Sequence, residues 1–169
     1  MTVTYRDARM EDAEPLDRLF DTVFCGTFAH LYRPEDLDAF LTSFTLDDWR
    51  SHLADPAYAF RVAEADGEVV GYVKLGPNKL PIATDRASIL LDQLYVANEH
   101  HGAGIARELM GWAIDEARRR GAEEIYLTVF IDNGRARRFY DRYGFEAVGR
   151  YDFMVGNQAD EDIIMRKSL

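Results

Sequence analysis

Two glycines in the middle of the chain, Gly102 and Gly104, could place backbone amides against an anion. Glycine lets the backbone turn tightly and puts no side chain between the amides and a ligand. The segment lies between an apolar run at 88–96 and a stretch at 105–120 whose apolar residues recur at helical spacing. The amides would therefore stand at a helix N-terminus, where unpaired N–H groups and the helix dipole both favour a phosphate.

Three kinds of phosphate-binding loop have glycines at such a turn. A Walker loop needs Lys and Ser or Thr after its last glycine, and neither follows Gly104. A dinucleotide-binding loop needs three spaced glycines after the first strand of a domain, whereas this strand lies mid-chain. The third kind is the pyrophosphate loop of an acyl-CoA transferase. A plain strand-to-helix turn is the alternative without chemistry.

A second motif follows at residues 133–145, which are predicted to form a helix that ends at Gly144. Asn133 and Tyr140 are seven residues apart and therefore share one face of that helix. Together the two motifs resemble those of the GNAT superfamily of acyl-CoA N-acyltransferases, and the order of the predicted elements extends the resemblance over nearly the whole chain. The matching positions are Gly102, Gly104 and Ala106, followed by Asn133, Ala136, Phe139, Tyr140, Gly144 and Phe145.

The resemblance implies an N-acetyltransferase that uses acetyl-CoA as cosubstrate and no metal. The glycine loop would hold the pyrophosphate, and the backbone of the preceding strand would pair with the pantetheine amides as an added strand does. Asn133 corresponds to the family's CoA-contacting asparagine and also suits a helix N-cap. The implied CoA-binding residues are Leu94, Tyr95, Val96, Gly102, Ala103, Gly104, Ile105, Ala106, Arg107, Asn133 and Arg142.

Three side chains are expected near the phosphates of CoA. Arg107 and Arg142 are predicted to reach the phosphates, with a solvated surface position as the alternative for each. His101 departs from the family pattern, which usually has Gln or Arg ahead of the glycines. We therefore expect a weaker phosphate contact at His101, without loss of function.

Tyr140 is the predicted general acid, because it matches the family's Phe-Tyr position. A phenol with a pKa of about 10 is protonated at neutral pH and can donate to a departing thiolate. Tyr143, three residues on, shares much of the same face and is the second candidate. The structural alternative for Tyr140 is a buried aromatic residue with a satisfied hydroxyl. A backbone N–H of the strand at 88–96 would polarise the thioester carbonyl.

Asp92 is the predicted general base, because it lies on the strand beside the expected thioester and could take the proton directly or through water. A carboxylate on a solvated face is the alternative. Glu64 and Glu99 suit the role less well, since neither lies mid-strand beside the reaction centre. His100 and His101 are expected over the phosphates, too far from the chemistry.

These groups require a sheet that splays between the strand ending at Val96 and the strand at 124–130. A bulge near Asp92–Gln93 would open it. We expect an α/β (α+β) fold of GNAT type, with a mixed, mostly antiparallel twisted sheet that is splayed at its centre and flanked by helices. Residues 1–169 are expected to form a single N-acetyltransferase domain.

Apolar alternation and turn residues predict the remaining elements. Helical patterns begin at Asp12, Pro34 and Thr45, the last with a capping box. Asp66-Gly67 is a hairpin signal, and residues 156–161 are predicted to form an acidic turn. Further strands are predicted at 3–6, 58–65, 68–75, 145–153 and 162–167.

Composition narrows the classes of function. Cys25 is the only cysteine, so an intrachain disulfide is excluded, a thiol zinc site is disfavoured and a reducing cytoplasm is expected. The net charge of −10 disfavours a nucleic-acid partner. No apolar run reaches membrane-spanning length and the start lacks the form of a signal peptide, so no membrane partner is expected. A homodimer is compatible with all of these properties.

The expected substrate is a small-molecule amine. Residues 27–41 and 153–165 resemble the bacterial polyamine (spermidine/spermine) acetyltransferase branch of the family. Acidic residues near the acceptor side could attract a polycation, although such clusters are more often only solvated. A non-catalytic acyl-CoA-binding sensor and a protein or peptide N-acetyltransferase are the alternatives. The acids are Glu35, Asp36, Asp38, Asp160, Glu161 and Asp162.

Overall fold

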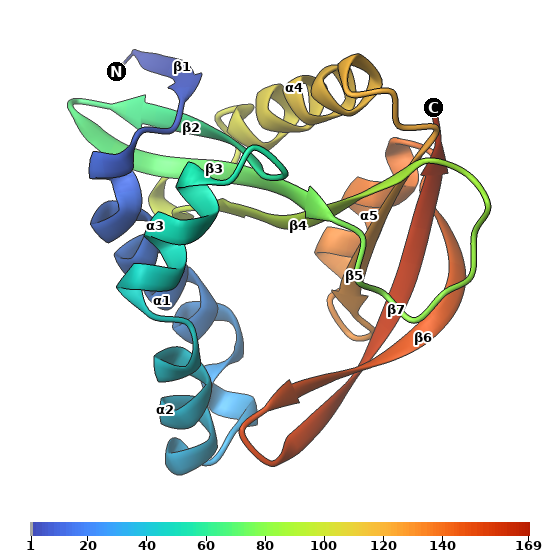
Figure 1. The fold of residues 1–169 in the computed structure, drawn as a ribbon. Coiled ribbons are helices and arrows are strands. Elements are labelled where there is room, and N and C mark those ends of the chain that lie inside the picture. Colours follow the sequence, from blue (N-terminus) through green and yellow to red (C-terminus); the bar gives the residue numbers. More distant parts are fainter. Residues whose placement is uncertain (1) are drawn as a thin grey trace.

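Seven strands form one twisted sheet in the computed structural model, which describes residues 2–169 (Figure 1). Their order is β1-β2-β3-β4-β5-β7-β6, and every neighbouring pair is antiparallel except β4 and β5. The predicted mixed, mostly antiparallel sheet is therefore confirmed. The strands are β1 (Val3–Asp7), β2 (Ala59–Ala65), β3 (Glu68–Pro77), β4 (Ser88–Val96), β5 (Glu124–Phe130), β6 (Glu146–Val155) and β7 (Gln158–Ser168).

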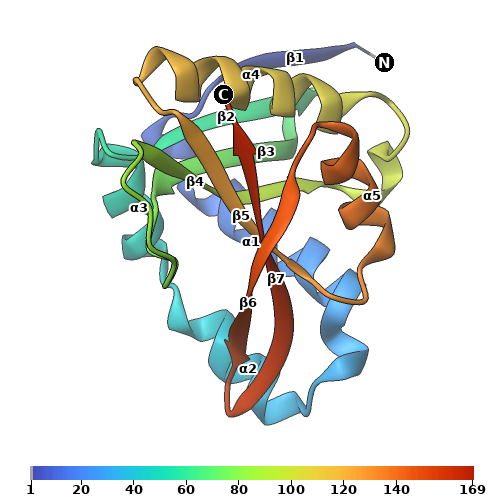
Figure 2. The ribbon, with the colours of Figure 1, turned by 90° about the vertical axis from the view of Figure 1, so that its right-hand side faces the viewer.

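Helices cover both faces of this sheet (Figures 1 and 2). The apolar stripe of α4, which includes the buried Leu109 and Ala113, packs on one face. Leu16 of α1 and Trp49 of α3 are buried against the other face. The helices are α1 (Ala13–Phe28), α2 (Pro34–Ser43), α3 (Leu46–Ala54), α4 (Ile105–Arg119) and α5 (Gly134–Arg142).

Helix boundaries follow the local signals with one extension. The capping box at Thr45 is present, because its hydroxyl accepts from the Asp48 amide at 3.2 Å and its amide donates to the Asp48 carboxylate at 2.7 Å. α1 runs through Phe28 into a 3-10 turn at Ala29–Leu31, a stretch in which no period is evident from sequence. None of the helices in residues 2–169 has both the length and the apolar character needed to cross a bilayer.

The sheet opens between β4 and β5, as Figure 1 shows. Their parallel pairing spans only Ser88–Leu90 on β4 and Glu124–Tyr126 on β5. On the other side of β4, Gln93 pairs with Lys74 but Leu91 pairs with the next residue of β3, so Asp92 is an extra, bulged residue. A bulge bends a strand and increases its twist. The splayed sheet and the bulge near Asp92–Gln93 are both present, at the place the site requires.

The β6–β7 hairpin reaches past the body of the sheet to α2 (Figure 2). Its turn is Gly156-Asn157, with Gly156 at φ +56°, and β7 begins at Gln158. The predicted acidic turn at 156–161 is therefore wrong, since residues 158–161 continue the strand. The polar residues at 158–161 are typical of a loop when only the local sequence is considered. In the structure their side chains form hydrogen bonds to segments far away in the chain. Asp160, for example, accepts a hydrogen bond from the Tyr32 hydroxyl.

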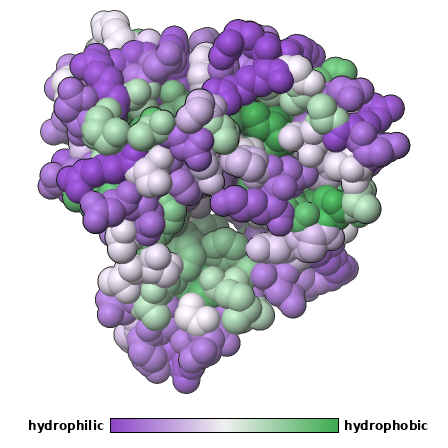
Figure 3. Space-filling view, viewed as in Figure 1, coloured by the Kyte–Doolittle hydropathy of each residue, from purple (hydrophilic) through white to green (hydrophobic). Residues whose placement is uncertain are grey.

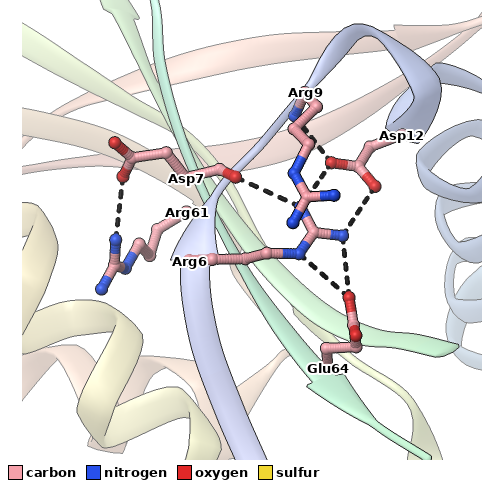
Figure 4. A network of polar contacts seen from close by, with 6 residues as sticks. All are labelled: Arg6, Asp7, Arg9, Asp12, Arg61 and Glu64. Atoms are coloured by element: carbon pink, nitrogen blue, oxygen red, sulfur yellow. Dashed lines mark hydrogen bonds and ion pairs between the residues drawn. The ribbon is translucent and has the colours of Figure 1, made fainter. Parts of the chain in front are cut away.

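A network of charged side chains fixes the start of the chain to β2 (Figure 4). Arg6 forms ion pairs with Asp12 and Glu64, each at 2.8 Å, and Arg61 pairs with Asp7 at 2.9 Å. Asp12 is buried and also accepts from the Arg9 amide at 2.7 Å. Burial alone would raise the pKa of Asp12, but the hydrogen bonds from Arg6 and Arg9 outweigh it and lower that pKa.

Replacing Asp12 by Asn should lower the free energy of unfolding by about 2 kcal/mol at pH 7, because Arg6 would lose its most buried partner. A carboxyl with a lowered folded pKa stabilises the fold above its unfolded pKa of about 4 and loses that contribution as pH falls further. The difference between the two proteins in urea denaturation should therefore shrink as pH falls below about 4.

Glu14→Gln is the control for this prediction. Glu14 forms an exposed pair with Arg18 at 2.9 Å on α1, so its loss should change stability little. An Asp12→Asn protein as stable as the wild type at pH 7 would show that the network contributes nothing to folding.

Candidate functional site

A cleft of about 580 Å³ occupies the opening of the sheet. Its walls come from β4, β5, the start of α4 and α5, and from α1, β6 and β7. In Figure 3 this face of the molecule is hollowed below its middle, and apolar residues line the hollow. Every residue predicted for CoA binding or catalysis except Ala103 lines the cleft. The structure therefore brings together nearly all of the residues that the two motifs and the strand singled out.

The glycine loop forms one end of the cleft. Gly102 and Gly104 have φ of +85° and +80°, in the left-handed region, and a Cβ at either would meet no atom within 4 Å. Gly104 is the N-cap of α4, and Ile105 is anchored in the core with 1% of its surface exposed. The two glycines therefore leave open space beside a fixed helix N-terminus, where the first amides of a helix have no partner within the helix. This cradle fits the pyrophosphate of a CoA molecule.

The exposed edge of β4 runs on from the loop. From Leu91 to Val96, β4 has no strand partner on its β5 side within residues 2–169. The Val96 carbonyl lies 2.9 Å from His101 Nε2, and His101 Nδ1 lies 2.8 Å from Arg135 Nη1. Because Arg135 only donates and the carbonyl only accepts, this geometry assigns the proton to Nε2. His101 thereby joins β4 to α5 at the loop end.

Polar side chains from the N-cap and body of α5 and from α4 also line the cleft. Asn133 accepts from the Ala136 amide at 3.3 Å, so it is the N-cap of α5 and also lines the cleft. Arg142 and Arg107 line the cleft as well. Together with Arg135 they make this end of the cleft basic.

Tyr140 lies in the cleft and packs edge-on against Phe145, with ring centroids 5.8 Å apart. Burial raises the pKa of Tyr140 to about 12, so the phenol holds its proton throughout the neutral range. Tyr143 lies elsewhere, in a separate depression beside Trp112 of α4. Tyr143, the second candidate for the general acid, is the C-cap residue after α5 and therefore lies outside the cleft that holds Tyr140.

Asp92 lines the cleft at the bulge, and its carboxylate is already paired. Its Oδ2 lies 3.2 Å from the ammonium of Lys74, whose side chain is only 2% exposed. Burial lowers the pKa of Lys74, and Asp92 acts in the opposite direction by favouring the charged form. The ammonium also lies 4.9 to 5.6 Å from the centroids of four rings, those of Phe44, Trp49, Tyr58 and Phe60.

The opposite end of the cleft is acidic, and it is formed by two of the six acids expected near the acceptor side, whose burial on β7 was not predicted. Asp160 and Asp162 lie on the same face of β7, with 8% and 6% of their surface exposed, and both line the cleft. Asp160 accepts from the Tyr32 hydroxyl and from Gln158 Nε2 at 3.2 Å. We call Tyr32, Asp160 and Asp162 the acidic end. The two-residue spacing of the aspartates was the available signal, once residues 158–161 are read as a strand.

The other predicted acids do not reach this end. Glu161 lies on the opposite face of β7 and pairs with Arg150. Asp36 is buried against the hairpin, where it pairs with Arg33 at 2.9 Å and accepts from the Asn157 amide at 3.0 Å. The six-residue acidic cluster is thus reduced to the two aspartates of β7.

The sequence matches the Acetyltransferase (GNAT) family over residues 24–145. This match covers most of the chain and both motifs, so the chain belongs to the GNAT family. It is accordingly an N-acetyltransferase, in agreement with the glycine loop, the splayed sheet and the cleft described above.

Individual relatives support the same class. The chain is 30% identical over 161 residues to an uncharacterized N-acetyltransferase of Mycobacterium tuberculosis, covering 95% of this chain and 99% of the relative. It is 31% identical over 147 residues to the aminoalkylphosphonate N-acetyltransferase of Salmonella typhimurium, covering 82% and 90%. The crystal structure of the PaiA N-acetyltransferase from Thermoplasma acidophilum in complex with coenzyme A shares the fold, with a TM-score of 0.79 at 22% identity and full coverage of both chains.

Proposed function

We propose that this enzyme transfers the acetyl group of acetyl-CoA directly to a primary amine on a small cationic molecule, with a polyamine such as spermidine as the first candidate. The observation that carries the proposal is the charge distribution of the cleft, which is basic at the glycine loop and acidic at Asp160 and Asp162. A polyphosphate suits the first end, and a cation suits the second.

Tyr140 is the proposed general acid in this reaction. It lines the same cleft, and its raised pKa keeps a proton available for the departing sulfur. The unpaired edge of β4 from Leu94 to Val96 is the proposed partner of the pantetheine amides, and one of its N–H groups would polarise the thioester carbonyl. Two carboxylates on the cleft walls, Asp92 and Asp162, are candidates for the proton of the amine.

A panel of amines tests the substrate class, with thiol release from acetyl-CoA as the readout. If polyamines are the acceptors, kcat/KM for spermidine should exceed that for the monoamine benzylamine and should fall steeply with added salt. Aminomethylphosphonate and an N-terminal peptide should be poor substrates, because each brings negative charge or bulk to the acidic end.

Equal efficiency for spermidine and benzylamine, or no dependence on salt, would remove the polyamine claim and leave an enzyme for simple amines. Preference for aminomethylphosphonate would instead favour the activity named for the Salmonella relative. Saturable binding of acetyl-CoA without turnover of any amine would contradict the proposed reaction.

A further inference from the structure

We propose that Asp162 is the acceptor-amine residue of this enzyme: its carboxylate binds the substrate ammonium at the acidic end of the cleft and takes up its proton. Asp160 is a positioning residue that acts through Asp162. The inference rests on the proposed function, because it places the amine in that reaction, and it names the residue and the kind of ligand that the acidic end accepts.

The first argument is the pairing of the buried charges. Six charged side chains are buried in residues 2–169, and four of them have an oppositely charged partner within 4 Å. Asp160 and Asp162 alone have none. A buried charge without a counterion costs several kcal/mol, so natural folds rarely keep one without a use. The four pairs are Asp12 with Arg6, Asp36 with Arg33, Lys74 with Asp92, and Glu124 with Arg166.

The second argument is the direction in which Asp162 faces. It stands opposite Phe130 of β5 and Tyr151 of β6 in the sheet register, on the face of β7 that lines the cleft. Its polar neighbour within the sheet is the Thr128 hydroxyl, which also lines the cleft. Asp162 as a whole is only 6% exposed, and it is one of the residues that line the cleft.

The surroundings fix the ligand as an alkylammonium. Aromatic side chains flank the two aspartates, with Phe28 edge-on to Phe130 at 6.0 Å between centroids and Phe153 directly opposite Asp160 in the hairpin. Such walls suit the methylene stem of an amine, and the carboxylates suit its charged head. An anionic group such as a phosphonate would be repelled at the same place.

Asp92 is the weaker candidate for the same role. Its Oδ2 lies 3.2 Å from the ammonium of Lys74, so a substrate ammonium at Asp92 would compete with an ion pair that already exists. Taking a proton from a substrate would leave that buried ammonium without its partner. Asp162 has no cationic partner to lose, and binding a proton or an ammonium would compensate its buried negative charge.

The proton affinity of Asp162 fits a general base. Burial raises the pKa of Asp162 to about 7, the charge of Asp160 adds to this, and the hydrogen bond from Thr128 acts against it. The titratable groups that face it are Asp160 on β7, Tyr32 after α1, Tyr95 on β4 and Tyr151 on β6, and none of them is a cation. A base with a pKa near the working pH is the most effective.

The protons balance in the resulting reaction. The ammonium gives one proton to Asp162, and the freed lone pair attacks the carbonyl carbon of the thioester. As the N–C bond forms and the C–S bond breaks, Tyr140 gives its proton to the sulfur and recovers one from the nitrogen. The products are the amide, the free thiol and one proton on Asp162, which passes to solvent.

The test compares four variants with the wild type: Asp162→Asn, Asp160→Asn, Asp92→Asn and Glu161→Gln. Asp162→Asn should lower kcat/KM for an amine at least about 100-fold, leave the Kd of acetyl-CoA within about twofold, and remove the fall in kcat/KM below about pH 7. Glu161→Gln, on the same strand but the opposite face, should behave as the wild type. Asp160→Asn should move the acid limb to lower pH, because it removes a like charge from beside Asp162.

The pH profiles of kcat/KM are measured with two amines of different pKa. An acid limb that came from deprotonation of the substrate would shift with the pKa of the amine. An Asp162→Asn enzyme that keeps both its rate and its acid limb would overturn the inference, as would loss of the limb in Asp92→Asn alone. Melting temperatures exclude misfolding, and Asp162→Asn should melt no lower than the wild type at pH 8 because it removes an unpaired buried charge.

Amine binding without turnover separates this inference from the proposed function. The ligand phenethylamine should raise the melting temperature of the wild type at pH 8 and not that of Asp162→Asn. If no amine is acetylated but this difference is seen, the proposed reaction fails and the ammonium site stands. If amines are acetylated and Asp162→Asn matches the wild type in rate, the reaction stands and the assignment of Asp162 fails.

Discussion

Replacing Tyr140 by Phe should lower kcat by about 100-fold or more, because the departing thiolate would lose its proton donor. The Kd of acetyl-CoA should change by less than about twofold, since the ring would keep its packing against Phe145 and only the hydroxyl is removed. Single-turnover thiol release measures the first quantity, and isothermal titration calorimetry measures the second.

Tyr143→Phe is the matched control, because it removes the same hydroxyl one turn further along the same segment but outside the cleft. Its kcat should stay within about twofold of the wild type. Full activity of Tyr140→Phe would transfer the proton donation to water. A parallel loss of rate in both variants would point to damage in the packing of α5, since Tyr143 stacks on Phe139 at 5.0 Å.

Replacing Gly104 by Val should abolish measurable binding of acetyl-CoA while the protein still folds. The Cβ would project into the open space before the first amides of α4, where nothing lies within 4 Å, and the branched side chain would fill the phosphate cradle. The φ of +80° is strained for a β-branched residue, so stability should also fall by about 1 to 3 kcal/mol.

Gly67→Val is the control that separates the effect of backbone strain from the effect of filling the phosphate cradle. Gly67 has the same φ of +80°, also with nothing within 4 Å, but it lies in the Asp66-Gly67 turn between β2 and β3. Both variants should show a similar drop in melting temperature, and only Gly104→Val should lose acetyl-CoA. Tight binding by Gly104→Val would place the pyrophosphate away from this loop.

The parts of the site that could be predicted are those set by local sequence. The glycines, Asn133 and Tyr140 each act through a turn, an N-cap or a helix face within a few residues, and these features are fixed by residue type and spacing. The splay could be inferred because the chemistry needs it, although the bulge at Asp92 depends on the pairing of β4 with β3.

Which of the six acids form the acidic end, and that they are buried, could not be predicted in the same way. The contacts of this end join residues 128 positions apart, Tyr32 and Asp160, and an acidic run after a glycine is typical of a loop until that contact is known. The two-residue spacing of Asp160 and Asp162 indicates a shared strand face only when the turn is known to consist of Gly156-Asn157 alone. Glu161 then falls on the other face, which no composition count distinguishes.

Lys74 pairs with Asp92 and also affects the register in which β3 joins the sheet. Its neighbours Val73 and Leu75 are fully buried in the aliphatic layer under α4, whereas its own ammonium lies among four rings on the opposite side of the sheet. A slip of β3 by one residue would exchange the two faces and drive the ammonium into the aliphatic layer, at a cost of several kcal/mol. Lys74 therefore acts as an alignment key, because its buried charge favours a single register of the β2–β3–β4 meander over the shifted ones.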